Sequence, residues 1–431
     1  MKTLNLSTFF LIAAVSLGCG GNDSSNMGGD GGVGGDGGAG GIAGVGGSAG
    51  AGGVGGSAGA GGVGGEAGTG GVGGDGGTGG MPVGTPDLLS EWGLFKSIAD
   101  QIPEDGVIPY EVTSALFTDS AAKFRFVQLP DGEQIHYSET ERWTNPPGTI
   151  YVKTFAYPVD ATQPELGYQL IETRLLVFHE DGLDVWTYVY PEGDNSDAER
   201  ISYGPVIDVS YTDENGELVE LAYEVPSVPT CRDCHGVGAN ARSLGPSTGM
   251  LNRDADYGGE VGVQNQIDYM HSLGMFDSEP NPVVEDRTTY VSKPATNTEA
   301  NLHDRVRSYL DSNCAHCHAP APFGLVEDKG LYVDYQSMDP DPAVGTSFFT
   351  WGVCKPHSSG GNGLDCDQPL DVVPGDPDNS FLICRMESVA AGERMAPVGR
   401  VTAHAEGVEL LREWVTELPN LFEGVNAGCP Q

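Results

Sequence analysis

Two copies of a five-residue motif, C-x-x-C-H, constrain this chain of 431 residues more than any other feature. The first copy spans Cys231–His235 and the second spans Cys314–His318. This spacing is typical of covalent haem attachment, in which two thiols bind the vinyl groups and the adjacent histidine binds the iron. We therefore predict two covalently attached haem c groups. The predicted attachment residues and proximal ligands are Cys231, Cys234, His235, Cys314, Cys317 and His318.

A zinc site is the main alternative, because the two motifs could pool cysteines and histidines around one tetrahedral ion. Free thiolates are disfavoured in an oxidising compartment, so the haem interpretation is preferred. His316 lies between the cysteines of the second motif, and we predict a spacer rather than a ligand.

Distal ligands are predicted from methionines in suitable loops. Met395 lies in GERMAPVGR, an extended segment between the second motif and the last helix, and is the favoured axial ligand of the second haem. Met386 lies in a predicted helix and is assigned to core packing. For the first haem the candidates are Met250, Met270, His271 and Met275, with Met250 slightly favoured. An open distal position would allow peroxide or another small ligand to bind the iron.

The N-terminal region indicates export. Lys2 is followed by a short apolar stretch and then by Leu17-Gly18-Cys19, as in a lipoprotein signal. We predict a signal peptide at 1–18, lipidation of Cys19, and a disordered Gly-rich tether at 19–85. An ordinary cleaved signal with an incidental Cys19 is the alternative. The predicted location is the periplasm or the cell surface, on a lipid anchor.

Charge restricts the class of partner. The formal net charge is −40, so nucleic acid is excluded as a partner, because phosphate binding requires clustered Lys and Arg. The predicted partners are other redox proteins with a basic or neutral docking face.

After Cys19 and the four motif cysteines are set aside, four of the nine cysteines remain: Cys354, Cys366, Cys384 and Cys429. In an exported chain an even remainder predicts two disulfides. Three pairings are possible, and Cys354–Cys366 is favoured because it closes a short Gly-rich loop. A redox pair or a metal site is the competing interpretation.

Residues 86–226 are predicted to form a mainly-β domain, an antiparallel sandwich or barrel, from several segments rich in β-branched and aromatic residues. Lys153, Glu172 and Arg174 alternate with apolar neighbours, and we expect them on solvated faces. Four aromatic residues are assigned to the core, with a sugar-binding platform as the alternative: Trp143, Trp186, Tyr188 and Tyr190.

The remaining sequence is divided at residue 298. Residues 227–297 form a first haem segment with no helix before its motif and a helix at 264–273 after it. Residues 298–431 are predicted to be a mainly-α, cytochrome c-like domain, because amphipathic helices precede Cys314 and span Glu406–Leu418. The whole chain is therefore predicted to be multidomain.

Several segments carry a family resemblance. They are LIETRLLV, YLDSNCAHCHAP, GDPDNSFL, ICRMES, RMAPVGR and EGVELLREWV. Together they resemble a poorly characterised bacterial family of di-haem c-type cytochromes over most of Pro86–Leu418. The resemblance implies haem attachment at both motifs, Met395 as an axial ligand, and electron transfer.

An electron carrier is thus the preferred function. The alternatives are a peroxidase-like or oxidase-like enzyme with an open first haem, and an electron-transfer module whose β domain binds carbohydrate or a partner.

Overall fold

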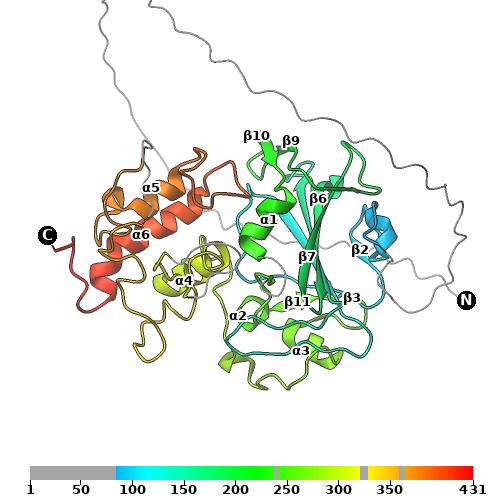
Figure 1. Cartoon of the computed structure of the whole chain (residues 1–431), viewed down its shortest axis with the longest axis horizontal. Helices are drawn as coiled ribbons and strands as arrows, with labels where there is room; N and C mark the ends of the chain where they lie inside the picture. Colours follow the sequence, from blue (N-terminus) through cyan, green and yellow to red (C-terminus); the bar gives the residue numbers. More distant parts are fainter. Residues whose placement is uncertain (1–83, 237–240, 321–328, 359–364, 431) are drawn as a thin grey trace, which may run out of the picture. The chain divides into compact units, whose positions relative to one another are not determined.

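The computed structural model describes residues 84–236, 241–320, 329–358 and 365–430 (Figure 1). The predicted signal peptide, Cys19 and nearly all of the Gly-rich segment lie outside the described residues. Over the described ranges, no helix is long and apolar enough to cross a membrane.

An antiparallel sheet of six strands carries the site on one of its faces. Its strands follow the chain in order: β3 (Val107–Pro109), β4 (Ala122–Gln128), β5 (Ile150–Pro158), β6 (Tyr168–His179), β7 (Gly182–Val189) and β8 (Glu199–Ile201). Each strand pairs with the next one, so the sheet is a meander. The antiparallel prediction is confirmed. The sheet is open, with β3 and β8 at its edges, so the barrel alternative is wrong.

Both faces of the sheet are covered by other parts of the chain. On one face, Val152 and Leu175 pack against Leu89 of η1 (Leu89–Trp92) and its neighbours. On the other, Tyr157 packs against Tyr223 of the hairpin formed by β9 (Val206–Thr212) and β10 (Leu218–Glu224). The short strands β1 (Phe95–Ser97) and β2 (Ile102–Pro103) form a separate pair.

The aromatic residues considered for a sugar-binding platform are used for packing. Trp143, Tyr188 and Tyr190 are buried, and Trp186 packs against the core that contains Leu89. The core assignment is confirmed and the platform is wrong.

Met250 and Ile267 pack with Tyr151 of the sheet in one buried cluster, and several short elements lie between the sheet and the second motif in the sequence. They are α1 (Val228–His235), α2 (Thr248–Leu251), β11 (Asp254–Asp256), β12 (Val263–Asn265), α3 (Gln266–Ser272) and η4 (Val284–Asp286), and η2 (Pro164–Leu166) lies between strands of the sheet. The helix predicted at 264–273 is confirmed as α3. Asn265 caps it by accepting hydrogen bonds from the Ile267 and Asp268 amides.

Two predicted helices of the C-terminal part are also confirmed. α4 (Leu302–Asn313) begins at the Asn301 cap, and α6 (Ala405–Leu421) packs against it. Val306 and Trp414 belong to the same buried cluster, together with Ile383 of α5 (Phe381–Glu387). The short η5 (Pro377–Asn379) precedes α5. Figure 1 shows α4, α5 and α6 gathered beside one another.

The prediction of a mainly-α, cytochrome c-like domain over 298–431 is wrong. Helices cover 21% and strands 24% of the described residues, and no mainly-α domain is evident among them. The chain between α4 and α5 is rich in Pro, Gly and Asp, which favour turns, and its described parts are irregular. The described residues also belong to one compact unit. The predicted domain boundaries near residues 226 and 297 are not tested by this division and remain predictions.

Long-range hydrogen bonds connect α4 to the segment between β3 and β4 of the sheet. The Asn313 side chain accepts a hydrogen bond from the Phe117 amide at 2.7 Å, and Ser114 donates to the Ser308 carbonyl at 2.9 Å. A separate α-helical domain would not depend on these partners.

Two disulfides connect the C-terminal segments, as predicted, but in a different pairing. Cys354 bonds to Cys429 and Cys366 bonds to Cys384, so the favoured Cys354–Cys366 pairing is wrong. Sequence proximity favoured the short loop, whereas the packing of the C-terminal tail brings Cys429 to Cys354.

Removing Cys354–Cys429 should destabilise the protein more than removing Cys366–Cys384. The bonds close loops with sequence separations of 75 and 18, and loop-closure entropy then gives about 4 and about 3 kcal/mol. Urea unfolding of Cys354→Ser/Cys429→Ser and Cys366→Ser/Cys384→Ser measures both losses. A reversed order would contradict the entropic argument.

Candidate functional site

The first C-x-x-C-H motif lies on a short helix of its own, α1. Ser227 caps this helix by accepting a hydrogen bond from the Thr230 amide, and Gly236 ends it with a positive φ. One turn of helix separates Cys231 from Cys234, so both thiols lie near the same face. Cys231 is buried against Leu183 and Val185 of β7, and α1 runs beside that strand (Figure 1).

The second motif follows α4 without a break. Cys314 caps the C-terminus of α4, and the amides of Cys317 and His318 both donate to the Cys314 carbonyl, at 3.0 and 2.9 Å. All four motif cysteines are free, whereas the other four described cysteines are in disulfides.

The fold brings the two motifs together, although more than 80 residues separate them in sequence. Ligand atoms of Cys234, His316 and Cys317 all lie within 4.8 Å of one another. The hydrogen bond between the thiols raises the pKa of Cys234 and lowers the pKa of Cys317, which makes Cys317 the acceptor. His316, predicted to be a spacer, lies at this meeting point.

Both motif histidines are neutral at neutral pH, the form in which a histidine can bind a metal. Burial lowers the pKa of His235 and of His318 to about 4. The Nδ1 atom of His235 lies 2.9 Å from the Arg242 carbonyl. Because a carbonyl only accepts, Nδ1 carries the proton and leaves the Nε2 lone pair available.

His318 is placed differently. Its Nδ1 atom is buried and has no hydrogen-bond partner among the described residues. A buried polar atom of this kind costs free energy unless a further group satisfies the ring. The Nδ1 atom of His318 therefore lacks a partner among the described residues.

One cavity connects most of the predicted residues. It is lined by both cysteine pairs, by His235, and by the sulfur-bearing side chains of Met250, Met386 and Met395. His318 is not among the lining residues. Further lining side chains come from α4, from the sheet and from the segment after Met395: Tyr309, Arg125, Lys153, Arg174, Arg400 and His404.

Among the four candidates for the first distal ligand, only Met250 lines this cavity. Met270 and Met275 belong to a buried core, and His271 is exposed on α3. Met250 is buried on α2, and its sulfur accepts a 3.7 Å hydrogen bond from Arg142. Arg142 is itself held by Asp311, so the sulfur already has a fixed partner.

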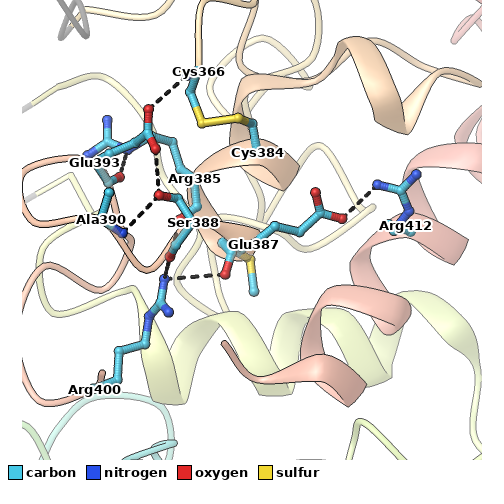
Figure 2. The surroundings of a disulfide bond; sticks show 10 residues. Cys366, Cys384, Arg385, Glu387, Ser388, Ala390, Glu393, Arg400 and Arg412 are labelled. Atoms are coloured by element: carbon cyan, nitrogen blue, oxygen red, sulfur yellow. Dashed lines mark hydrogen bonds and ion pairs between the residues drawn. A yellow bond between two sulfur atoms is a disulfide. The ribbon is translucent and has the colours of Figure 1, made fainter. Parts of the chain in front are cut away.

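The Met395 loop is fixed from two sides. The buried Arg400 guanidinium donates to several backbone carbonyls, including that of Met395 at 2.8 Å. Figure 2 shows its hydrogen bond to the Ser388 carbonyl, at 2.9 Å. Asp119, from the segment before β4, accepts from the Val401 and Thr402 amides. A loop held in this way presents the Met395 side chain with little conformational freedom.

Disulfide Cys366–Cys384 supports the same loop. Figure 2 shows the Glu393 carboxylate between the Cys366 amide, at 2.7 Å, and the Ser388 hydroxyl, at 2.5 Å. Arg385, next to Cys384, donates to the Glu393 carbonyl. The residues just before Met395 are therefore tied to the disulfide.

Replacing Arg400 with Gln should cost about 3 kcal/mol of folding free energy, because several buried carbonyls lose their donor. Urea unfolding measures the loss. Arg412→Gln is the matched control: its ion pairs with Asp378 and Glu387 are partly exposed, and such pairs contribute about 0–1 kcal/mol. Equal losses in the two variants would show that Arg400 does not organise this loop.

The prediction that Lys153, Glu172 and Arg174 lie on solvated faces is wrong. Glu172 is fully buried, and Lys153 and Arg174 are half-buried and line the cavity rather than a solvated face. Alternation with apolar neighbours indicates two faces, but it does not show that a second layer covers the charged one.

Other residues at the cavity carried no sequence signal of their own. His404 stacks on Phe117 with ring centroids 4.2 Å apart, and its Nδ1 lies 3.0 Å from the Tyr309 hydroxyl. Asp119 belongs to the site only through contacts that join segments far apart in the chain.

No protein-family model matches this chain, and no curated protein or solved structure is similar to it.

Proposed function

We propose that this protein is an exported electron carrier that holds two covalent haem c groups. The observation that carries the proposal is the meeting of the two C-x-x-C-H motifs: Cys234 and Cys317 touch, and both motifs line one cavity. Two haems attached there would lie beside one another, which is the arrangement that electron transfer between them requires.

The residues present fit such a group. Cys231, Cys234, Cys314 and Cys317 are free thiols, so each pair can form two thioether bonds. Burial raises the pKa of Cys314 to about 12, so this thiol is protonated and uncharged before attachment. His235, whose Nε2 lone pair is available, and His318 would supply one iron ligand per motif.

Bound haem iron would supply one-electron exchange between its ferric and ferrous states. The chain's own contribution is to position ligands and exclude water. Met395, held by the Arg400 and Asp119 contacts, is the proposed axial ligand of the second haem, and Met250 is the proposed one for the first. Ligation by histidine and methionine raises the reduction potential.

The proposed location, partners and electron-transfer role are supported by the sequence. The signal-like start and Cys19 favour a lipid-anchored protein in the periplasm or at the cell surface. The formal charge of −40 favours redox partners with a basic or neutral docking face. The segments quoted above, which resemble a di-haem cytochrome family, favour electron transfer.

A redox titration followed by visible absorption tests this function. We expect two one-electron steps and low-spin spectra in both oxidation states. A high-spin ferric component that binds cyanide and consumes peroxide would instead favour the enzyme alternative. A protein without any reducible chromophore would contradict the proposal.

A zinc site is the second candidate, and the Cys234, His316 and Cys317 cluster favours it. Two thiolates and an imidazole are common zinc ligands, and a fourth ligand would complete the tetrahedron. Elemental analysis decides between the two: one zinc per chain with an unmodified polypeptide mass would support zinc, and iron with an increased mass would exclude it.

A further inference from the structure

Three cationic side chains form a row across three adjacent strands of the sheet. Arg125 of β4 lies directly opposite Lys153 of β5, and Lys153 lies directly opposite Arg174 of β6. Like charges in directly opposed positions destabilise a sheet. This row therefore requires a compensating group.

Among the described residues, an ion pair compensates the charge at only one end of the row. Arg174 forms an ion pair with the buried Glu172, which also accepts a hydrogen bond from Tyr223. Arg125 and Lys153 form no ion pair with any carboxylate in the described ranges. Arg125 donates only to the Lys123 carbonyl, at 3.3 Å, and Lys153 lies over the Phe155 ring, 4.9 Å from its centroid.

The pKa values of two lysines in this part of the sheet also indicate that a negative charge is missing beside the row. Burial, followed by repulsion from Arg125, lowers the pKa of Lys153 well below its usual value. Burial also lowers the pKa of the adjacent Lys123 to about 7. A negative group beside Lys153 in the cavity would oppose this shift and raise the pKa of Lys153.

The position of the row indicates which group this is. Arg174 is close enough to Cys231 for each to influence the pKa of the other, so the β6 end of the row lies at the thioether side of the first motif. Neighbouring strands are about 4.8 Å apart, so Arg125 lies roughly 10 Å farther along the cavity. A porphyrin spans a comparable distance and carries its two propionates on the side away from its vinyl groups.

We propose that Arg125 and Lys153 bind the propionate carboxylates of the haem attached at Cys231 and Cys234. This assignment rests on the proposed function. It gives β4 and β5 a specific role: the sheet neutralises and orients the far edge of the first haem, while α1 holds the near edge.

Variants of the intact haem-loaded protein test the assignment. Lys153→Gln and Arg125→Gln remove a positive charge near the first haem, so its reduction equilibrium constant should fall about tenfold, which is about 59 mV for one electron. Lys153→Arg should retain the potential. Lys96→Gln, a partly exposed lysine paired with Asp105, is the control and should leave both potentials unchanged.

Resonance Raman spectra give a readout independent of potential, because propionate bending modes shift when their hydrogen bonds are lost. We expect that shift in Lys153→Gln and Arg125→Gln, but not in Lys153→Arg. Unchanged bending modes and potentials, in a protein that retains both haems, would overturn this inference and leave the proposed function intact. A change confined to the second haem would also overturn it.

An external carboxylate is the other source of the missing charge, and added acetate distinguishes it. If propionates occupy the site, the wild-type first potential should not respond to acetate at constant ionic strength. A saturable response to acetate that is lost in Lys153→Gln would assign the site to a free anion and overturn the propionate assignment. Absence of covalent haem would instead contradict the proposed function itself.

Discussion

Replacing Cys314 and Cys317 with serine is expected to halve the covalent haem content of the protein. Each motif supplies the two thiols for one haem, and serine forms no thioether. The second motif lies on the turn after α4, whereas the first lies on α1 against β7. Since separate elements hold them, the first motif should remain able to accept its haem. Intact mass under denaturing conditions counts the groups.

The matched control exchanges a different cysteine pair. Cys366→Ser/Cys384→Ser removes a disulfide near Met395 but no motif thiol, so it should retain two haems. Cys231→Ser/Cys234→Ser should also retain one haem, the one on the second motif. Loss of both haems from either motif variant would show that attachment at one motif requires the other, and would contradict independent sites.

Replacing Met395 with Leu should lower the reduction potential of one haem and leave the other unchanged. Leu conserves side-chain volume, so packing is affected little, but it removes the thioether that stabilises the ferrous state. We expect the reduction equilibrium constant to fall more than tenfold, which is more than about 59 mV. The weak long-wavelength absorption band of methionine-ligated ferric haem should disappear for that haem. Spectroelectrochemistry measures both effects.

Met386→Leu is the control for this substitution. Met386 also lines the cavity, but it lies on α5 and packs in the buried cluster around Trp414. It should retain both the potential and the absorption band. If Met386→Leu abolishes the band and Met395→Leu does not, the ligand assignment is wrong.

Local features of the fold could be predicted because they depend on neighbouring residues. The amphipathic spacing of Val306 and Leu310 indicates α4, and strand-like segments indicate the antiparallel sheet. The architecture around α4 could not be predicted in the same way. Its contacts with Ser114 and Phe117 join segments nearly 200 residues apart, and they place α4 in the same compact unit as the sheet.

In the site, too, local features could be predicted from the sequence, whereas contacts between distant segments could not. The motif cysteines and histidines are recognisable from spacing alone, but the contact between Cys234 and Cys317 depends on how α1 and α4 pack. The cation row on β4, β5 and β6 depends on strand register, which sequence alternation does not specify. Disulfide Cys354–Cys429 likewise joins positions with a sequence separation of 75.

The central claim is that both C-x-x-C-H motifs carry covalent haem. Intact mass spectrometry tests it most directly, on protein produced in a host that attaches c-type haem and then denatured in acid. The account predicts a polypeptide heavier by two haem groups, with no free thiol at Cys231, Cys234, Cys314 or Cys317. An unmodified polypeptide with four free thiols at these positions, with or without bound zinc before denaturation, would contradict it.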